Sequence, residues 1–466
     1  MSTFARKLAA AAVSAVLVAP AAHATNGYFA IGYGAKSMGM GGVGVAFSQD
    51  SLAAASNPAG MTMVGNRADL GLRLFNPNRN STLDVAGLGA GGPTAKADSG
   101  ATLFAIPNAG FVMQAANMTM GLSLYGNGGM NTRFSRNIFD ETAANLGYLG
   151  AFGPPIPDGI TGTGRPDTGT LGVDLSQLII SPSISMKMNE THSFGAALLI
   201  GVQRFSAYGL GNFQCFTATA NSTPDSQNSC ATTGFPTVYS DKLTNQGHDF
   251  AYGAGVRVGW IGQLTDSVSV GATAASKIYM TEFDKYEELF AEEGDFDIPA
   301  NYAVGIAVKV TPKTTVALDV QRILYEGVNS VSNAGPVPSA GGPTLGAGSG
   351  LLGANNGLGF GWEDMTIYKL GVNYEYNSKL ALRAGFNYGD GPIEPSQVLF
   401  NVIAPGVVEK HLTLGLTYSP SSNSEWNVAY MHAFEESVET DQTAFNVPGK
   451  LEMDQNSLDI SYAFKF

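Results

Sequence analysis

The last nine residues of the chain, LDISYAFKF, alternate between apolar side chains and polar or small ones. The apolar positions are Leu458, Ile460, Tyr462, Phe464 and Phe466. Successive side chains of a β-strand point to opposite faces, so one face of this segment is wholly apolar. A strand of a soluble sandwich can alternate too, but it rarely carries aromatic residues at three successive positions of one face. We therefore expect a strand whose apolar face meets lipid.

The same period of two recurs upstream, most clearly in residues 252–260, 368–376, 380–388 and 412–418. In each segment the apolar positions alternate with small, polar or charged residues that would line a lumen. From this period we place strands at 66–80, 101–114, 118–135, 171–188, 192–209, 248–263, 267–283, 294–310, 314–330, 363–376, 379–393, 408–419, 424–441 and 450–466.

The connections between these strands alternate in length. Short turns are expected at 115–117, 189–191, 264–266, 311–313, 377–378 and 420–423. Most of the intervening loops are longer, as at 81–100, 136–170, 210–247 and 331–362. Outer-membrane barrels need short periplasmic turns and long outer loops, whereas a soluble sandwich gives no reason for this alternation. The sequence therefore predicts an all-β fold, a 14-stranded antiparallel transmembrane β-barrel over residues 66–466.

Residues 1–24 have the features of a secretory signal peptide. Arg6 and Lys7 precede an apolar stretch at 8–19 that is too short to span a bilayer. The tripeptide Ala-His-Ala, which ends at Ala24, has the small-x-small pattern that signal peptidases cleave. We expect the mature chain to begin directly after it, in the outer membrane of a bacterium.

Composition excludes several function classes. Cleavage lowers Lys+Arg from 25 to 23 against 38 Asp+Glu, so the mature net charge of about −15 argues against a nucleic-acid partner. No later apolar run is long enough for a transmembrane helix. A closed barrel is the other structure that satisfies its backbone hydrogen bonds in lipid.

Residues 25–65 separate the signal peptide from the first strand. They are rich in Gly and small residues, whereas a disordered tail would be more charged and less apolar. A barrel of this size lies between small barrels filled by side chains and larger ones that enclose a channel. We therefore predict that this segment folds as a plug inside the lumen.

The same segment resembles a known family. The run GMGGVG at 39–44, Asp50 and the run NPAGM at 57–61 are similar to the hatch signature of the FadL/TodX-type transporters of long-chain fatty acids and hydrocarbons. The likeness extends over the mature chain, for example at Pro107-Asn108, 193–195 and 430–432. It implies a hatch at the periplasmic end whose gating residues are Gly41, Gly42, Asn57, Pro58 and Ala59.

The resemblance also implies a path for the substrate. A hydrophobic compound binds first among the outer loops, passes to an internal pocket and leaves sideways when the hatch changes. Loops 136–170 and 210–247 would form the outer groove, with Phe152 and Ile156 in a stretch that is apolar for an exposed loop. The alternative is a loop that packs on itself.

A glycine cluster interrupts the third predicted strand at Gly126, Asn127, Gly128 and Gly129. Glycine inside a strand marks a bulge or a close approach of another backbone. The resembled family has a kinked third strand that forms a lateral opening, so we place the exit here. A plain bulge with no exit is the alternative.

Arg204 matches an arginine of the family by its offset from Phe194. It would bind a carboxylate head group by charge-assisted hydrogen bonds. Strict alternation would instead point it outward, where it would reach the membrane interface. Cys215 and Cys230 would form a local disulfide in an oxidising compartment, and two free thiols are the alternative.

No enzyme chemistry stands out in the sequence. Gly39, Gly41 and Gly44 satisfy a dinucleotide-binding pattern, but that motif needs a βαβ unit around it. We expect no catalytic residues, no metal and no cofactor. The expected function is passive uptake of a hydrophobic small molecule by a monomer surrounded by outer-membrane lipid and lipopolysaccharide. A porin for polar solutes and a surface adhesin are the alternatives.

Overall fold

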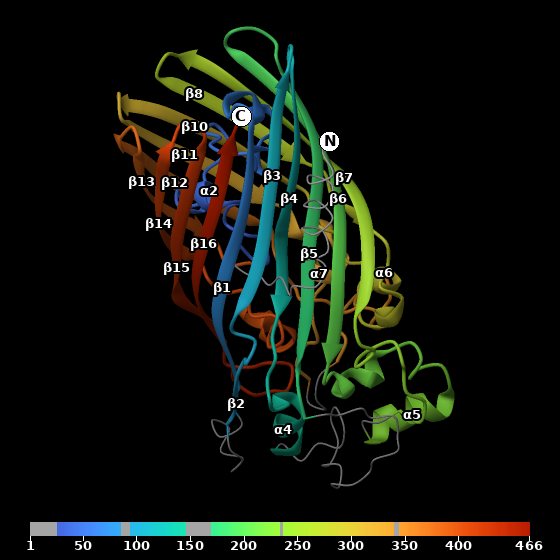
Figure 1. Cartoon of the computed structure of the whole chain (residues 1–466). Helices are drawn as coiled ribbons and strands as arrows, with labels where there is room; N and C mark the ends of the chain where they lie inside the picture. The colour runs from blue at the N-terminus through green and yellow to red at the C-terminus, as the bar shows by residue number, and fades with distance from the viewer. Residues whose placement is uncertain (1–25, 85–93, 146–168, 234–235, 340–343) are drawn as a thin grey trace.

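Antiparallel strands form a closed ring in the computed structural model of the chain, which describes residues 26–84, 94–145, 169–233, 236–339 and 344–466 (Figure 1). The strands of the ring are β1 Arg67–Leu83, β3 Phe104–Ala115, β4 Met118–Asn131, β5 Gly172–Lys187, β6 His192–Tyr208, β7 Asp249–Thr265, β8 Val268–Ala275, β10 Asn301–Thr311, β11 Thr314–Ile323, β12 Met365–Asn377, β13 Leu380–Gly389, β14 Lys410–Ser421, β15 Ser424–Thr440 and β16 Gly449–Lys465.

Each strand of the ring pairs with its neighbours in sequence. The ring closes between β16 and β1, in a register that runs from Arg67↔Lys465 to Leu83↔Gly449. Two short strands lie outside the ring: β2 (Ala95–Asp98) pairs with β1, and β9 (Tyr279–Met280) pairs with β7. The predicted 14-stranded antiparallel barrel is confirmed.

Apolar side chains cover the outside of the ring. On β1, Leu70, Leu72 and Leu74 are exposed, while the alternate residues Arg73 and Phe75 are buried. The other strands repeat this pattern with exposed Leu, Val, Ile, Tyr and Phe. Alternate residues of each strand thus lie on a lipid-facing outer face and on an inner face, as the sequence predicts.

The two ends of the barrel differ. Turns of a few residues join the strands at the end where β1 begins and β16 finishes. Long loops occupy the opposite end, where α4 and α5 lie (Figure 1). The helices of the loops are α4 Ile138–Asn145, η3 Gly211–Phe216, α5 Pro224–Thr233, η4 Asp284–Tyr286, α6 Ala291–Gly294, η5 Tyr325–Gly327, α7 Asn329–Ser332, η6 Pro395–Gln397 and α8 Val398–Asn401. None of the helices in the described ranges is long and apolar enough to cross a membrane.

Several strands are shorter at their outer ends than the sequence predicts. The predicted strands 267–283, 294–310, 314–330 and 379–393 are strands 268–275, 301–311, 314–323 and 380–389 in the structure. Several apolar residues of the predicted strands beyond these ends are buried beneath the outer loops instead of facing lipid, among them Phe283, Phe296 and Val328. An alternating sequence pattern cannot distinguish an apolar residue that is buried beneath a loop from one that faces lipid.

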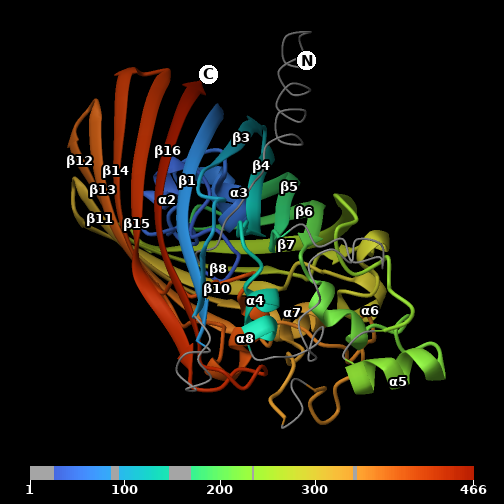
Figure 2. The same cartoon turned by 90° about the horizontal axis from the view of Figure 1, so that it is seen from below.

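Residues 26–64, called here the N-terminal segment, lie inside the ring. They contain three short helices, α2 (Ala35–Met38), α3 (Ala53–Ser56) and η1 (Pro58–Met63). Figure 2 shows this segment in blue with the strands around it. The predicted signal peptide, residues 1–24, lies outside the described residues.

Candidate functional site

The N-terminal segment packs its main chain directly on glycines of the barrel wall. A Cβ atom at Gly271 on β8 would lie 2.5 Å from the carbonyl oxygen of Val45. One at Gly371 on β12 would lie 2.7 Å from the carbonyl oxygen of Met40. We call the wall residues of this kind the glycine contacts: Gly195, Gly271, Gly371, Gly385 and Gly415. Any larger residue at these positions would push the segment away from the wall.

Asn57 is fully buried and joins the segment to the wall. Its Nδ2 atom donates hydrogen bonds to the carbonyl oxygens of Val45, at 2.8 Å, and of Trp260 on β7, at 3.0 Å. Its Oδ1 atom accepts from the N–H of Ala59 at 3.1 Å and so caps η1. Asn57 therefore couples the fold of the segment to its position in the barrel.

The other predicted hatch residues also lie against the wall. Pro58 contacts Gly195 on β6 and Gly259 on β7. Gly41 donates its N–H to the hydroxyl of Thr413 on β14 at 2.8 Å. Gly42 has a positive φ of 87°, which glycine adopts without strain.

Buried charges hold the same segment. Lys36 Nζ lies 2.6 Å from Glu425 Oε2 on β15, and Arg67 Nη2 lies 3.0 Å from the same oxygen. Lys465 forms a third ion pair with this carboxylate. On β11, Asp319 Oδ2 accepts the N–H groups of Gly44 at 2.8 Å and Val45 at 3.0 Å. Polar contacts between the N-terminal segment and the wall thus occupy the part of the lumen nearer the short turns.

The wall is broken between β3 and β4. The two strands pair only from Ala109↔Leu124 to Ala115↔Met118, and the register of β4 shifts between Gly126 and Gly128. Beyond this point β4 stays paired with β5 but has lost β3.

The N-terminal segment occupies part of the edge that β4 exposes there. The N–H of Ala30 donates to the carbonyl of Asn127 at 3.0 Å, and that of Gly129 donates to the carbonyl of Tyr28 at 3.2 Å. The predicted glycine cluster therefore coincides with the break in the wall. Its use as an exit stays a prediction.

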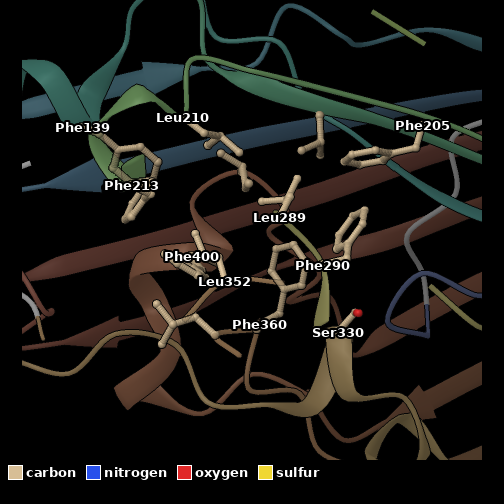
Figure 3. Close-up of a pocket in the computed structure, with 14 residues that line it drawn as sticks. Phe139, Phe205, Leu210, Phe213, Leu289, Phe290, Ser330, Leu352, Phe360 and Phe400 are labelled. Atoms are coloured by element: carbon tan, nitrogen blue, oxygen red, sulfur yellow. The ribbon is translucent and has the colours of Figure 1, made fainter. Parts of the chain in front are cut away.

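An apolar pocket lies beneath the outer loops (Figure 3). Its space is about 480 Å³, including the part open to solvent, and its lining contains no charged side chain. Six of the lining residues are phenylalanines that come from separate parts of the chain: Phe139, Phe205, Phe213, Phe290, Phe360 and Phe400. The enclosed part of this space measures only about 30 Å³, but its apolar lining suits a hydrocarbon group and offers no partner for an ion.

Aromatic rings connect this pocket to the N-terminal segment. The ring of Phe290 lies 4.8 Å from that of Phe296, which lies 6.0 Å from that of Tyr28. Tyr28 also contacts the rings of Tyr325 and Trp362, at 5.2 and 5.7 Å. Since the carbonyl of Tyr28 is bonded to β4, the pocket and the break in the wall share one packed cluster.

The three residues that the sequence analysis predicted to bind substrate are Phe152, Ile156 and Arg204. Phe152 and Ile156 lie outside the described residues. Arg204 lies on the outer face of β6, and its Nη2 atom pairs with Asp174 Oδ2 at 2.9 Å. This favours the interfacial role over a binding role. Its neighbour Phe205, which the sequence analysis did not select, faces the pocket.

Cys215 and Cys230 form a disulfide bond in the loop between β6 and β7. No group of His, Cys, Asp and Glu residues within the described ranges has the arrangement of a metal site.

Comparisons with known proteins identify the architecture. Residues 167–466 match the profile of the family described as "Outer membrane protein transport protein (OMPP1/FadL/TodX)". A search of curated proteins finds no match.

Solved structures of the same shape cover nearly the whole chain. The toluene transporter TodX of P. putida is 20% identical with a TM-score of 0.64, over 94% of this chain and 99% of its own. The toluene transporter TbuX of Ralstonia pickettii is 18% identical with a TM-score of 0.59, over the same shares. A Pseudomonas aeruginosa FadL homologue is 14% identical with a TM-score of 0.62, again over 94% and 99%. At these identities the likeness shows the fold alone.

Proposed function

Because this chain belongs to the outer membrane protein transport family (OMPP1/FadL/TodX), we propose that it is a passive channel for hydrophobic compounds such as long-chain fatty acids or hydrocarbons. The protein is a multi-pass barrel of the outer membrane, and its family consists of transport proteins and not of enzymes. We further propose that it works as a monomer surrounded by lipid and lipopolysaccharide.

The apolar pocket beneath the outer loops is the observation that carries this proposal. Burial of a CH₂ group is favourable by about 0.8 kcal/mol, so a long acyl chain gains on the order of 10 kcal/mol on leaving water. A lining of six phenylalanines with no charged side chain supplies such a surface at the outer end of the barrel. Entry of the substrate into this pocket needs no external energy.

The route beyond the pocket follows from what fills the lumen. The N-terminal segment closes the part of the lumen nearer the short turns with polar contacts. An apolar substrate that passed there would leave these polar groups without partners, which costs free energy. We propose that this segment is a hatch and that the substrate leaves through the break between β3 and β4. Release requires the segment to detach residues 28–30 from β4, which is a switch between two packings.

Uptake of labelled oleate and of labelled toluene tests the proposal, in cells that lack their own channels for these compounds. Phe213→Asp places a charge in the pocket and is expected to reduce uptake of whichever compound enters. Val238→Asp, on an exposed position of the same loop, is the matched control and should have no effect.

Surface expression of each variant is measured in parallel. If the wild-type protein admits neither compound above the empty-vector rate, the proposal fails. Entry of sugars into liposomes would then favour a porin, and loop-dependent cell binding would favour an adhesin.

A further inference from the structure

A second space lies inside the barrel, between the N-terminal segment and the wall. Residues of the segment form one side of it, and residues of β7, β8, β10, β11 and β12 form the other. Its volume is about 390 Å³ with the part that opens to its surroundings, and about 20 Å³ where it is enclosed. Three charged side chains line this space: Arg257, Asp319 and Lys369. It therefore differs in chemistry from the apolar pocket beneath the outer loops.

Arg257 is a buried cation of the wall that has only neutral partners. It lies on the inner face of β7 and is 6% exposed. Its Nη1 atom donates to the carbonyl of Ser56 in the N-terminal segment at 3.2 Å, and its Nη2 atom lies 3.5 Å from Asn301 Oδ1. Its Nε atom is buried and has no hydrogen-bond partner. Among the described residues, no carboxylate pairs with this guanidinium.

Lys369 is a second buried cation on the same space. Its Nζ atom donates to the carbonyls of Ile31 and Gly42 in the N-terminal segment, at 3.3 and 3.5 Å. Asp319 lies opposite Lys369 in the register of β11 and β12. One oxygen of Asp319 accepts two main-chain N–H groups of the segment, and the other, Oδ1, has no hydrogen-bond partner. This carboxylate can balance the charge of one of the two cations.

One positive charge is thus left without a counter-ion in this space. Buried charges in proteins are normally paired, because an isolated ion loses its hydration. Two other buried cations in this barrel follow that rule, since Lys36 pairs with Glu425 and Arg73 pairs with Asp459. The volume limits what can supply the missing charge. A single water molecule needs roughly 10–15 Å³ of such space, so the enclosed part admits a small ion and excludes an organic acid.

We propose that this space binds one small inorganic anion such as chloride, between Arg257 and Lys369. The ion accepts hydrogen bonds from Arg257 Nε and from the Lys369 ammonium, and charge-assisted bonds of this kind are stronger than neutral ones. Arg257 also holds the carbonyl of Ser56, and Lys369 holds that of Ile31. The bound ion therefore fastens the N-terminal segment to β7 and β12 at once. This inference does not depend on which compound passes the barrel.

Hydrogen exchange of the purified full-length protein in detergent tests the anion site. Exchange of residues 39–64 is compared in sodium chloride and in sodium gluconate at equal ionic strength, because gluconate is too large for the enclosed space. Chloride should slow this exchange in a saturable way. At a chloride concentration ten times the dissociation constant, the detached fraction of the segment should fall about elevenfold.

Three variants assign the effect to its residues. Arg257→Met and Lys369→Met should each abolish the difference between chloride and gluconate, whatever their exchange rate in gluconate. Arg204→Met, the matched control, removes an arginine on the outer face that is paired with Asp174, and it should keep the difference. The heat-dependent shift in gel mobility checks that each barrel is folded.

Crystals of the wild type grown in sodium bromide give a direct readout that needs no variant. Bromide scatters anomalously, and we expect one anomalous peak between Arg257 and Lys369.

The proposal is overturned if gluconate protects the segment as well as chloride does, or if Arg257→Met and Lys369→Met both keep the difference. Absence of a bromide peak at this place overturns it too. A peak without any effect of chloride on exchange would mark an adventitious ion only and would also overturn it. Each of these results leaves the proposed function untouched, because uptake of oleate or toluene is measured separately.

Discussion

Replacement of Gly271 by alanine should loosen the N-terminal segment while leaving the barrel at least as stable. The new Cβ atom would lie 2.5 Å from the carbonyl oxygen of Val45, closer than van der Waals contact permits. Because Gly271 is fixed between β7 and β10 by strand pairing, the segment has to move. In the strand itself, alanine is favoured over glycine by roughly 0.5–1 kcal/mol.

The expected magnitude follows from the hydrogen bonds around Val45. Its carbonyl accepts from Asn57 at 2.8 Å, and the N–H groups of Gly44 and Val45 donate to Asp319 at 2.8 and 3.0 Å. Each of these bonds contributes about 0.5–1.5 kcal/mol net, so their weakening costs about 2 kcal/mol in total. The detached fraction of the segment should then rise roughly thirtyfold.

Hydrogen exchange followed by mass spectrometry measures this effect on the purified protein. Peptides from residues 39–64 should exchange faster in Gly271→Ala, while peptides from the barrel strands should not. Gly327→Ala is the matched control, because no atom lies within 4 Å of a Cβ at that position.

Unchanged exchange of residues 39–64 would refute the argument that main-chain contact at the wall holds the segment. Equal acceleration in Gly327→Ala would refute it as well, since that change touches nothing.

Three other predictions concern charge, pH and the disulfide. Glu425→Gln removes a carboxylate shared by three cations. It should weaken the attachment of the N-terminal segment to the barrel wall by about 3–5 kcal/mol, and limited proteolysis of the segment should become faster. Burial, together with the adjacent Asp297, raises the pKa of Asp295 to about 7. A raised carboxyl pKa means that the folded loop binds the extra proton, so its stability falls as pH rises from about 4 to 7, and Asp295→Asn should abolish this change in hydrogen exchange. Reduction of the Cys215–Cys230 disulfide, whose ends are 15 residues apart, should cost the outer loop about 3 kcal/mol and speed its cleavage by protease without unfolding the barrel.

The strands could be predicted from the sequence because lipid dictates their pattern. One face of every strand must be apolar, and the alternation can be read without knowledge of any partner. The break in the wall could also be located, because the glycines at 126, 128 and 129 interrupt that alternation in the third strand, where the family resemblance implies a kink.

The pocket could not be predicted in the same way. Five of its six phenylalanines come from loops far apart in the sequence, and only the closed fold brings Phe139, Phe290 and Phe400 together. A buried loop aromatic and a lipid-facing one look alike in a sequence.

The glycine contacts invert the usual relation between burial and tolerance to substitution. In an ordinary core the large side chains are constrained, because neighbouring side chains interlock. Here the wall contributes only hydrogen atoms, and the main chain of the N-terminal segment lies on them. At these positions the main chain of the segment sets the limit on substitution, and even a single methyl group added to the wall would displace it. Saturation mutagenesis of such a barrel should find its least replaceable positions among its smallest residues.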